Sequence, residues 1–267
     1  MNKLVLASLN TCWGSFDLYN LTLRYKSIAK YFNNSPVDVI NFQEVFTYYH
    51  LFLLKRLLSG YFFCTYQNSL LGPKGGLVTF SRLALEKTQY ITYNRHFVPY
   101  LGKSYIEIFT MRGALVTDIK EINVSLVNTH LTAVLDHDWS KTGKYFSELS
   151  SEIDQFHQLV HNRTSSGLVV ASGDFNIAKA TDLYLKLIDY PTVYDPFKKD
   201  EILTRHQEFA AVGKKTNHID YVFIFDSKRQ HKLLANERLF DDKVMLDNQQ
   251  MGYVSDHVGL QVSLEVK

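Results

Sequence analysis

Apolar residues of this chain fall into two patterns that predict different elements. Apolar residues at helical spacing predict helices at residues 21–32, 47–60, 146–160 and 179–188, with Thr47 as an N-cap and Gly60 as an exit. Short, nearly continuous apolar runs predict strands. These runs lie at residues 4–9, 37–42, 61–66, 76–81, 83–91, 105–110, 114–119, 123–128, 168–171, 218–225 and 257–266.

The predicted strands outnumber the helices, and Gly, Pro and Asn residues separate several neighbouring strands by short turns. Such an order suits two packed, mostly antiparallel sheets with helices on their outer faces. A chain of 267 residues is long enough to bury one large core. It contains no internal repeat or Pro/Gly/Ser-rich linker, so we expect residues 1–267 to form a single domain.

Polar residues stand where several of the predicted strands begin or end. They are Asn10, Glu44, Asn128-Thr129-His130-Leu131, Gly173-Asp174-Phe175-Asn176, His218-Ile219-Asp220-Tyr221 and Ser255-Asp256-His257. Each has an ordinary explanation when taken alone, because a single Asp or Asn after a strand is most often a turn former. Six separate groups of carboxylates, amides and histidines at strand ends instead indicate one shared site.

The carboxylates and amides of this set suit a hard divalent cation. Mg²⁺ binds one or two carboxylates and completes its octahedron with water and phosphate oxygens. Glu44, Asp174 and Asp256 can supply the carboxylates, and Mn²⁺ is an acceptable substitute ion. Asn10 and Asn176 can hold a ligand water or a phosphate oxygen without adding negative charge.

The two histidines of the set suit proton transfer and charge stabilisation. His257 offers a proton acceptor near neutral pH, and Asp220 can orient its ring. His130 can donate a hydrogen bond to a phosphate oxygen as charge builds in the transition state. The histidines do not have the spacing of zinc ligands, and the sequence has no glycine-rich phosphate loop of Walker type.

These six groups occur in the same order in the endonuclease/exonuclease/phosphatase family, which the chain resembles from Leu4 to about Val266. The resemblance implies a four-layer α/β sandwich with its site at one end of two packed sheets. It implies Glu44 as the principal Mg²⁺ ligand, with Asn10 adjacent and Asp256 in support.

The resemblance also assigns roles around the attacking water. It implies that His257, aligned by Asp220, acts as the general base, while Asp174 and Asn176 position the water and the phosphate. Whether Asp174 or His257 takes the proton stays open at this point. No group of the set is absent, which argues against an inactive binding protein on the same fold.

The substrate class is a separate question, because the fold hosts many phosphoesterases. His130 stands where abasic-site endonucleases tend to have Tyr, and the layout of residues 73–82 and 112–115 resembles neutral sphingomyelinases. The lead expectation is therefore a phosphodiesterase acting on a phospholipid of sphingomyelin type, with peripheral membrane contact through the aromatic residues of segment 90–109. A nuclease is the first alternative, and an inositol-phosphate phosphatase is the second.

The charge balance and the hydropathy of the chain bear on its expected partners and its cellular location. Lys and Arg number 29 against 27 acidic residues, and this balance weakens the case for a dedicated duplex-DNA binder. No run of about 18 apolar residues is present, so we expect no transmembrane segment. The first apolar run leads directly to Asn10, so we interpret it as a strand and expect a soluble, cytoplasmic protein with free thiols at Cys12 and Cys64.

Overall fold

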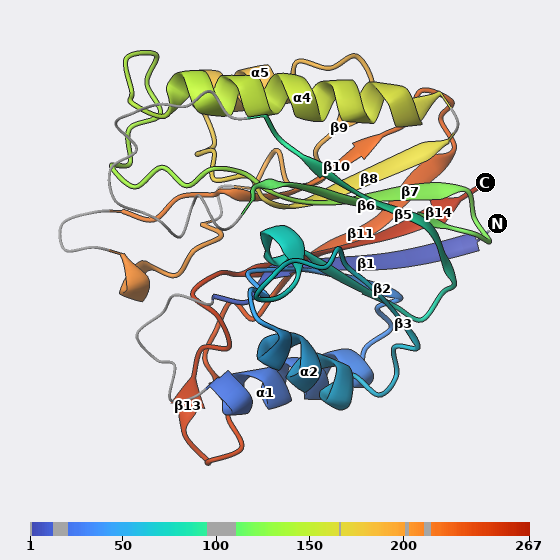
Figure 1. The fold of residues 1–267 in the computed structure, drawn as a ribbon, viewed down its shortest axis with the longest axis vertical. Helices are drawn as coiled ribbons and strands as arrows, with labels where there is room; N and C mark the ends of the chain where they lie inside the picture. The colour runs from blue at the N-terminus through green and yellow to red at the C-terminus, as the bar shows by residue number, and fades with distance from the viewer. Residues whose placement is uncertain (1, 13–20, 95–110, 166, 201–202, 211–214) are drawn as a thin grey trace.

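The computed structural model describes residues 2–12, 21–94, 111–165, 167–200, 203–210 and 215–267 (Figure 1). Two six-stranded sheets pack face to face, and helices cover their outer faces. This arrangement confirms the predicted four-layer α/β sandwich. The strand predicted at residues 105–110 lies outside the described residues.

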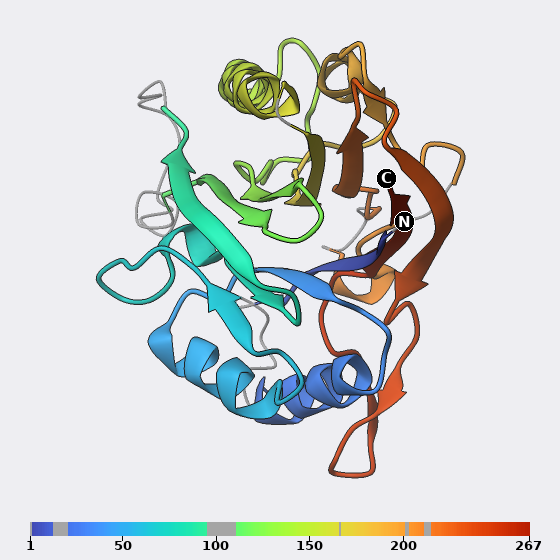
Figure 2. The same ribbon diagram turned by 90° about the vertical axis from the view of Figure 1, so that its right-hand side faces the viewer.

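The first sheet has the strand order β11-β14-β1-β2-β4-β3. Its strands are β11 (His231–Leu239), β14 (Gly259–Val266), β1 (Asn2–Asn10), β2 (Val39–Gln43), β4 (Val78–Ser81) and β3 (Phe63–Thr65). The helices α1 (Leu21–Asn33) and α2 (Tyr48–Leu57) cover its outer face, at the bottom of Figure 2. Thr47 caps α2 by accepting a hydrogen bond from the His50 N–H, as predicted.

The second sheet has the strand order β5-β6-β7-β8-β10-β9. Its strands are β5 (Leu85–Thr92), β6 (Gly113–Ile119), β7 (Val124–His130), β8 (Leu168–Asp174), β10 (Asp220–Phe225) and β9 (Val193–Tyr194). The helices α4 (Phe146–Thr164) and α5 (Asp182–Ile188) cover it. Three smaller features are η2 (Lys74–Gly76), η3 (Gln207–Phe209) and a hairpin of β12 (Val244–Met245) and β13 (Met251–Gly252).

Side chains alternate across the strands and fill two kinds of core. In β1, Leu4 and Leu6 pack in the layer between the sheets, whereas Val5 and Ala7 pack against the helices. The central strands are buried on both faces, which explains why they appear in the sequence as continuous apolar runs. Among the described residues, no helix combines the length and the apolar character needed to cross a bilayer.

The layer between the sheets changes from apolar to polar close to the strand ends. Asn41 donates to Ser172 Oγ at 2.9 Å, and Gln43 donates to Asn128 Oδ1 at 2.8 Å. Asn128 in turn donates to the carbonyl oxygens of Phe42 at 3.0 Å and Val78 at 3.2 Å. These buried bonds join β2 and β4 of one sheet to β7 and β8 of the other, next to the residues singled out from the sequence.

Candidate active site

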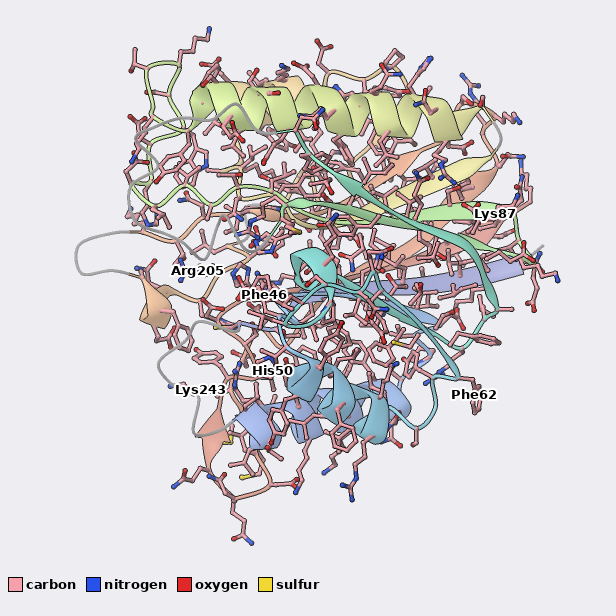
Figure 3. The ribbon with its side chains drawn as sticks, viewed as in Figure 1. Phe46, His50, Phe62, Lys87, Arg205 and Lys243 are labelled. Atoms are coloured by element: carbon pink, nitrogen blue, oxygen red, sulfur yellow. The ribbon has the colours of Figure 1, made fainter. Side chains whose placement is uncertain are left out.

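Most of the predicted site residues line one cavity of about 620 Å³, and the other two, Asn10 and Asp220, contact residues of its wall. Its walls include Glu44 from the first sheet and His130 and Asp174 from the second. Arg205 also lines it and lies toward the left of Figure 3, whereas Phe62 lies toward the right, away from the cavity. Because the wall combines both sheets, the site depends on how they are aligned.

The backbone turns sharply where the strands deliver these side chains. Glu44 and Asn176 have φ of 64° and 52°, in the left-handed region that residues other than glycine seldom adopt. Gly173 has φ of 148°, and a Cβ there would lie 1.9 Å from the carbonyl oxygen of Thr129. The glycine of the Gly-Asp-Phe-Asn segment is therefore required by the close approach of β8 to β7.

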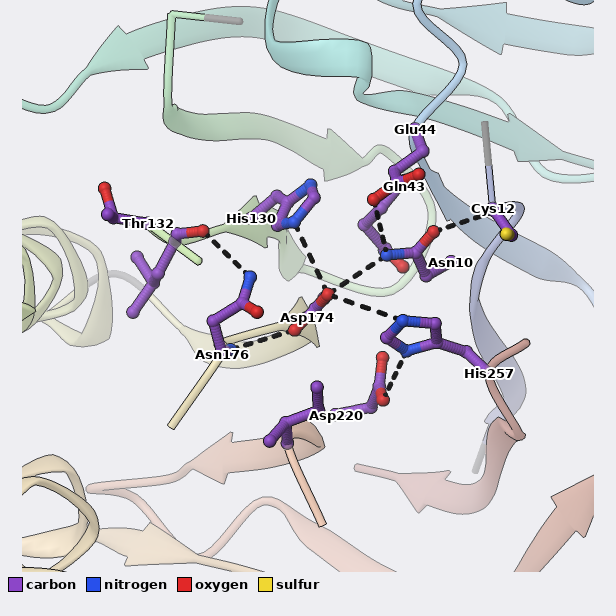
Figure 4. A network of polar contacts seen from close by, with 12 residues as sticks. Asn10, Cys12, Gln43, Glu44, His130, Thr132, Asp174, Asn176, Asp220 and His257 are labelled. Carbon is purple, nitrogen blue, oxygen red and sulfur yellow. Dashed lines mark hydrogen bonds and ion pairs between the residues drawn. The ribbon is translucent and has the colours of Figure 1, made fainter. Parts of the chain in front are cut away.

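Asp174 is the hub of the polar network in Figure 4. Its Oδ2 accepts a hydrogen bond from Asn10 Nδ2 at 3.0 Å and lies 3.4 Å from His130 Nε2. Its Oδ1 accepts from the Asn176 N–H at 2.9 Å. Burial favours the neutral acid, but the contacts with His130, His257 and Asn176 outweigh it and lower the Asp174 pKa.

His257 and Asp220 form a buried imidazole–carboxylate pair. His257 Nδ1 lies 2.9 Å from Asp220 Oδ2. The other ring nitrogen, Nε2, lies 3.9 Å from Asp174 Oδ2 and 3.8 Å from Asp256 Oδ1. Burial disfavours the imidazolium, yet the attraction of Asp220, Asp256 and Asp174 raises the pKa of His257 above its ordinary value. The ring is therefore oriented by one carboxylate and presents its free edge to two others.

The pKa of His130 is shifted in the opposite direction to that of His257. Burial and the positive charge of Arg112 lower its pKa, with Asp174 opposing the shift. A neutral ring whose Nε2–H faces Asp174 leaves Nδ1 as an acceptor, and this atom is buried without a hydrogen bond to the described residues. His130 must gain a proton before it can also donate from Nδ1 to a phosphate oxygen, the role predicted for it.

Comparison with solved structures identifies the fold. The chain aligns over 100% of its length with 100% of TDP2 from D. rerio in complex with a single-strand DNA product, at 17% identity and a TM-score of 0.75. It aligns over 98% with 99% of sphingomyelinase C from Streptomyces griseocarneus, at 14% identity and a TM-score of 0.73. A Bacteroides vulgatus protein described as an endonuclease/exonuclease/phosphatase matches over 100% of both chains, at 17% identity and 0.72.

The chain has the endonuclease/exonuclease/phosphatase fold. This confirms at the level of the fold the resemblance carried by the six strand-end groups. No protein-family model matches the sequence. No curated protein matches it either.

Within this endonuclease/exonuclease/phosphatase fold, two sets of donors could hold a metal ion. Asp174, Asp220 and His257 offer ligand atoms within 4.8 Å of one another. The second set is the one expected from the sequence, namely Glu44, Asn10 and Asp256. We favour the second set because Asp220 is already engaged by His257 Nδ1, and because a hard cation prefers oxygen ligands.

Two residues of the second set each keep an oxygen that could contact a cation. Asp256 Oδ2 is held by Arg205, with Nη2 at 3.1 Å and Nε at 3.2 Å, while its Oδ1 is buried and accepts no hydrogen bond from the described residues. Asn10 turns its Nδ2 to Glu44 Oε1 at 3.3 Å, and its Oδ1 accepts from the Cys12 N–H at 2.9 Å. Asn10 therefore orients Glu44, and its oxygen keeps one lone pair for a further contact.

Several residues that shape the site were missed by the sequence analysis. Thr204 Oγ1 accepts from the N–H groups of Ile219 and Asp220, which holds the start of β10. Arg24 on α1 donates to the carbonyl oxygens of Thr11, Cys12 and Val254, tying the loop after β1 to the segment before His257. Neither Thr204 nor Arg24 belongs to a recognisable strand-end group, so no sequence pattern points to them.

The predicted membrane-contact segment is described only in part. Tyr93 is buried and shares a hydrogen bond with Thr129 Oγ1, so it belongs to the core. Tyr90 donates to the carbonyl oxygen of Met111. The remaining aromatic residues of the segment lie outside the described residues, so membrane contact stays a prediction. Cys12 and Cys64 are both free, as expected.

Proposed function

We propose that this protein is a Mg²⁺-dependent hydrolase of phosphodiesters, with a phospholipid of sphingomyelin type as its lead substrate class. One observation carries the proposal: two histidines and several carboxylates, delivered by strand ends of both sheets, line a single cavity. Hydrolysis of a phosphodiester needs a water activated by a base and a positive environment for the phosphoryl oxygens. The donor set around the cavity is of the kind that meets both needs.

In this proposal, the residues of the site fall into metal ligands, a general base with its orienting partner, and a residue that positions the water. A bound Mg²⁺ would stabilise charge on the phosphoryl oxygens as a Lewis acid, and Glu44, Asp256 and Asn10 are the residues that would hold it. His257 Nε2 removes the proton of the attacking water, and Asp220 orients the imidazole and stabilises its positive charge. Asp174 accepts hydrogen bonds from the water and keeps it in line with the phosphorus.

The two candidate bases differ in basicity, which favours His257. The pKa of Asp174 is lowered by its donors, so its carboxylate is a weak base. The pKa of His257 is raised by the surrounding carboxylates, so its neutral imidazole is a strong base. A bound cation would oppose this rise and bring the imidazole closer to its ordinary range. His257 is therefore the base in our proposal, with Asp174 as its positioning partner.

A nuclease is the second candidate, and a specific observation favours it. The TDP2 structure that the chain matches over its full length holds a single-strand DNA product. In this chain Phe209 lines the cavity, and its ring lies 5.7 Å from that of Tyr253, which stacks on His206 at 4.0 Å. Aromatic rings beside a phosphate site can stack on bases. The sphingomyelinase match supports the lipid candidate in the same way.

Parallel assays test the proposal and separate its two substrates. The purified protein is incubated with sphingomyelin vesicles, single-stranded DNA, supercoiled plasmid and inositol phosphates, with Mg²⁺ or with EDTA. We expect Mg²⁺-dependent release of phosphocholine from the vesicles, which His257→Ala abolishes. Cleavage of DNA alone, with affinity falling steeply as salt rises, would replace the lipid by the nucleic acid. Absence of cleavage for every substrate in Mg²⁺ and Mn²⁺ would refute the proposed activity.

A further inference from the structure

The solvent-exposed side of helix α2 is aromatic. The helix lies in the outer layer at the bottom of Figure 2, and its inner positions, such as Leu51 and Leu54, are buried against the first sheet. Its outer positions carry Tyr48, Tyr49 and Phe52, and the last two are 58% and 56% exposed. Residues three or four positions apart are neighbours on a helix surface, so both tyrosines lie beside Phe52.

A loop that packs on the start of α2 extends this surface. The Tyr48 N–H donates to the carbonyl oxygen of Leu71 at 3.2 Å, and the Tyr48 hydroxyl donates to that of Ser69 at 2.8 Å. These bonds hold the loop against the helix, and two leucine side chains of the loop remain in solvent, with Leu70 90% and Leu71 66% exposed. The surface formed by helix and loop is called the α2 face and comprises Tyr48, Tyr49, Phe52, Leu70 and Leu71.

The long helix of the other outer layer shows the ordinary pattern. Helix α4 also buries one side against its sheet, and its exposed positions include Asp154, Gln158 and Asn162. Single exposed apolar residues are normal on a protein surface, whereas a contiguous apolar patch marks contact with another molecule. The α2 face is of the second kind.

The charges next to the α2 face are of one sign. The chain contains no Asp or Glu from residue 45 to residue 85, an interval that holds four basic residues. Lys55 and Arg56 follow Phe52 by three and four positions, so they border the aromatic residues on the same side of α2. Lys55 Nζ lies 4.8 Å from the ring centre of Tyr66, and neither basic residue forms an ion pair with another described residue. The face is therefore apolar at its centre and positive at its border.

We infer that the α2 face docks on a lipid surface that carries anionic headgroups. Tyr rings suit the headgroup level of a bilayer because they have an apolar body and a polar tip, and Phe and Leu side chains suit the acyl boundary beneath it. Lys55 and Arg56 are attracted to anionic headgroups. A second copy of this chain would instead bring the same positive charges together across a two-fold axis, and their repulsion opposes that contact.

The inference goes beyond the proposed function and rests on it in one respect, the choice of a lipid as the occupant. Helix α2 begins four residues after Glu44, which lines the cavity. Docking of its first turn would hold the cavity close to the bilayer, where a phospholipid substrate is found. The α2 face is a different part of the chain from segment 90–109, in which membrane contact was predicted from the sequence.

Vesicle sedimentation in EDTA tests docking without turnover. The intact protein is mixed with vesicles of phosphatidylcholine, with or without phosphatidylserine, and the bound fraction is measured for the wild type and for Tyr49→Ser/Phe52→Ser. We expect the wild type to bind the vesicles that contain phosphatidylserine, and the double variant to bind them about tenfold more weakly or less, because two apolar anchors are lost. Leu185→Ser is the matched control, because Leu185 is 57% exposed on α5, over the other sheet. It should bind like the wild type.

Charge variants test the contribution of the headgroups. Lys55→Gln/Arg56→Gln should bind the vesicles with phosphatidylserine about tenfold more weakly than the wild type does. Lys228→Gln/Arg229→Gln removes an equally basic exposed pair from the turn between β10 and β11, and it should bind like the wild type. All of these substitutions are at exposed positions, so each melting temperature should stay close to that of the wild type.

Equal vesicle binding by the wild type and Tyr49→Ser/Phe52→Ser, or no binding of the wild type to either vesicle, would overturn the inference. A wild-type dimer that the double variant dissociates would also overturn it, because the α2 face would then belong to a second copy. The proposed function fails separately. Vesicle binding that depends on the α2 face, without hydrolysis of any phospholipid in Mg²⁺, would refute the lipid substrate and keep the docking surface. Hydrolysis of vesicle lipid at an unchanged rate in the double variant would overturn the docking and keep the proposed function.

Discussion

Replacement of Asn128 by alanine tests whether the polar layer between the sheets aligns the two halves of the site. Asn128 is fully buried in β7 and makes three hydrogen bonds to the other sheet, with Gln43, Phe42 O and Val78 O. A buried hydrogen bond contributes about 1 kcal/mol net, so losing all three should lower the free energy of unfolding by about 3 kcal/mol. For a domain of this size, that corresponds to a fall in melting temperature of roughly 6–12 °C.

Asn128→Ala should also lower kcat, even at a temperature where the variant is fully folded. Gln43, the main partner of Asn128, directly precedes Glu44, so its displacement shifts a proposed metal ligand relative to Asp174 on the other sheet. A misplacement of about 1 Å can lower a rate by around a hundredfold. We therefore expect Asn128→Ala to lose most of its kcat at a temperature where urea titration shows it to be fully folded.

Leu126→Ala supplies the matched control. Leu126 lies two residues earlier on β7 and packs in the apolar part of the same layer, so its truncation should cost a comparable 2–5 kcal/mol. It touches none of the polar bonds near Glu44, and its kcat should stay close to that of the wild type. If both folded variants show the same kcat, or if Asn128→Ala loses less than about 1 kcal/mol, the alignment argument is wrong.

Three further predictions concern single side chains. Asp220→Asn should lower kcat by a smaller factor than His257→Ala. It should also shift the acidic limb of the pH–rate profile to lower pH, because the pKa of the base His257 falls when the Asp220 charge is removed; superimposable profiles of Asp220→Asn and the wild type would contradict the pairing. Glu44→Gln should raise the Mg²⁺ concentration for half-maximal activity at least tenfold while the melting temperature without metal stays within a few degrees. Asp226 accepts from the His231 N–H and ring, and although burial opposes ionisation, these bonds lower its pKa. The stability they contribute is present above about pH 4 and lost as pH falls through the lowered pKa, so urea titrations should show a smaller acid-induced loss in Asp226→Asn.

The sequence predicted the strand-end residues well for a physical reason. Buried strands appear as continuous apolar runs, so a polar residue that ends such a run is conspicuous, as at Asn10 and Asp174. The strands β7 and β8 continue to His130 and Asp174, a little further than the apolar runs predicted. The proposed catalytic groups therefore belong to the sheet, and their positions are held by its hydrogen bonds.

Features that depend on contacts between distant segments could not be predicted. Asn41 and Gln43 lie inside the strand β2, and nothing in their sequence context predicts their hydrogen bonds to the second sheet. The strand β11 contains Lys232, Asn236 and Glu237 and lacks the apolar run that marks the other long strands in the sequence. Arg112 is separated in sequence from every strand-end group, and only the fold shows that its Nε and Nη1 have no hydrogen-bond partner among the described residues.

The pairing of β1 with β14 determines when the active site forms during folding. Asn2 lies opposite Val266 in this antiparallel pair, so the centre of the first sheet closes a very long loop of the chain. Contacts of such high sequence separation form late and slow folding, because the entropy of loop closure is lost before the contacts form. His257 lies two residues before the start of β14. During refolding, hydrolytic activity should therefore recover with the slowest phase, after most helical signal has returned.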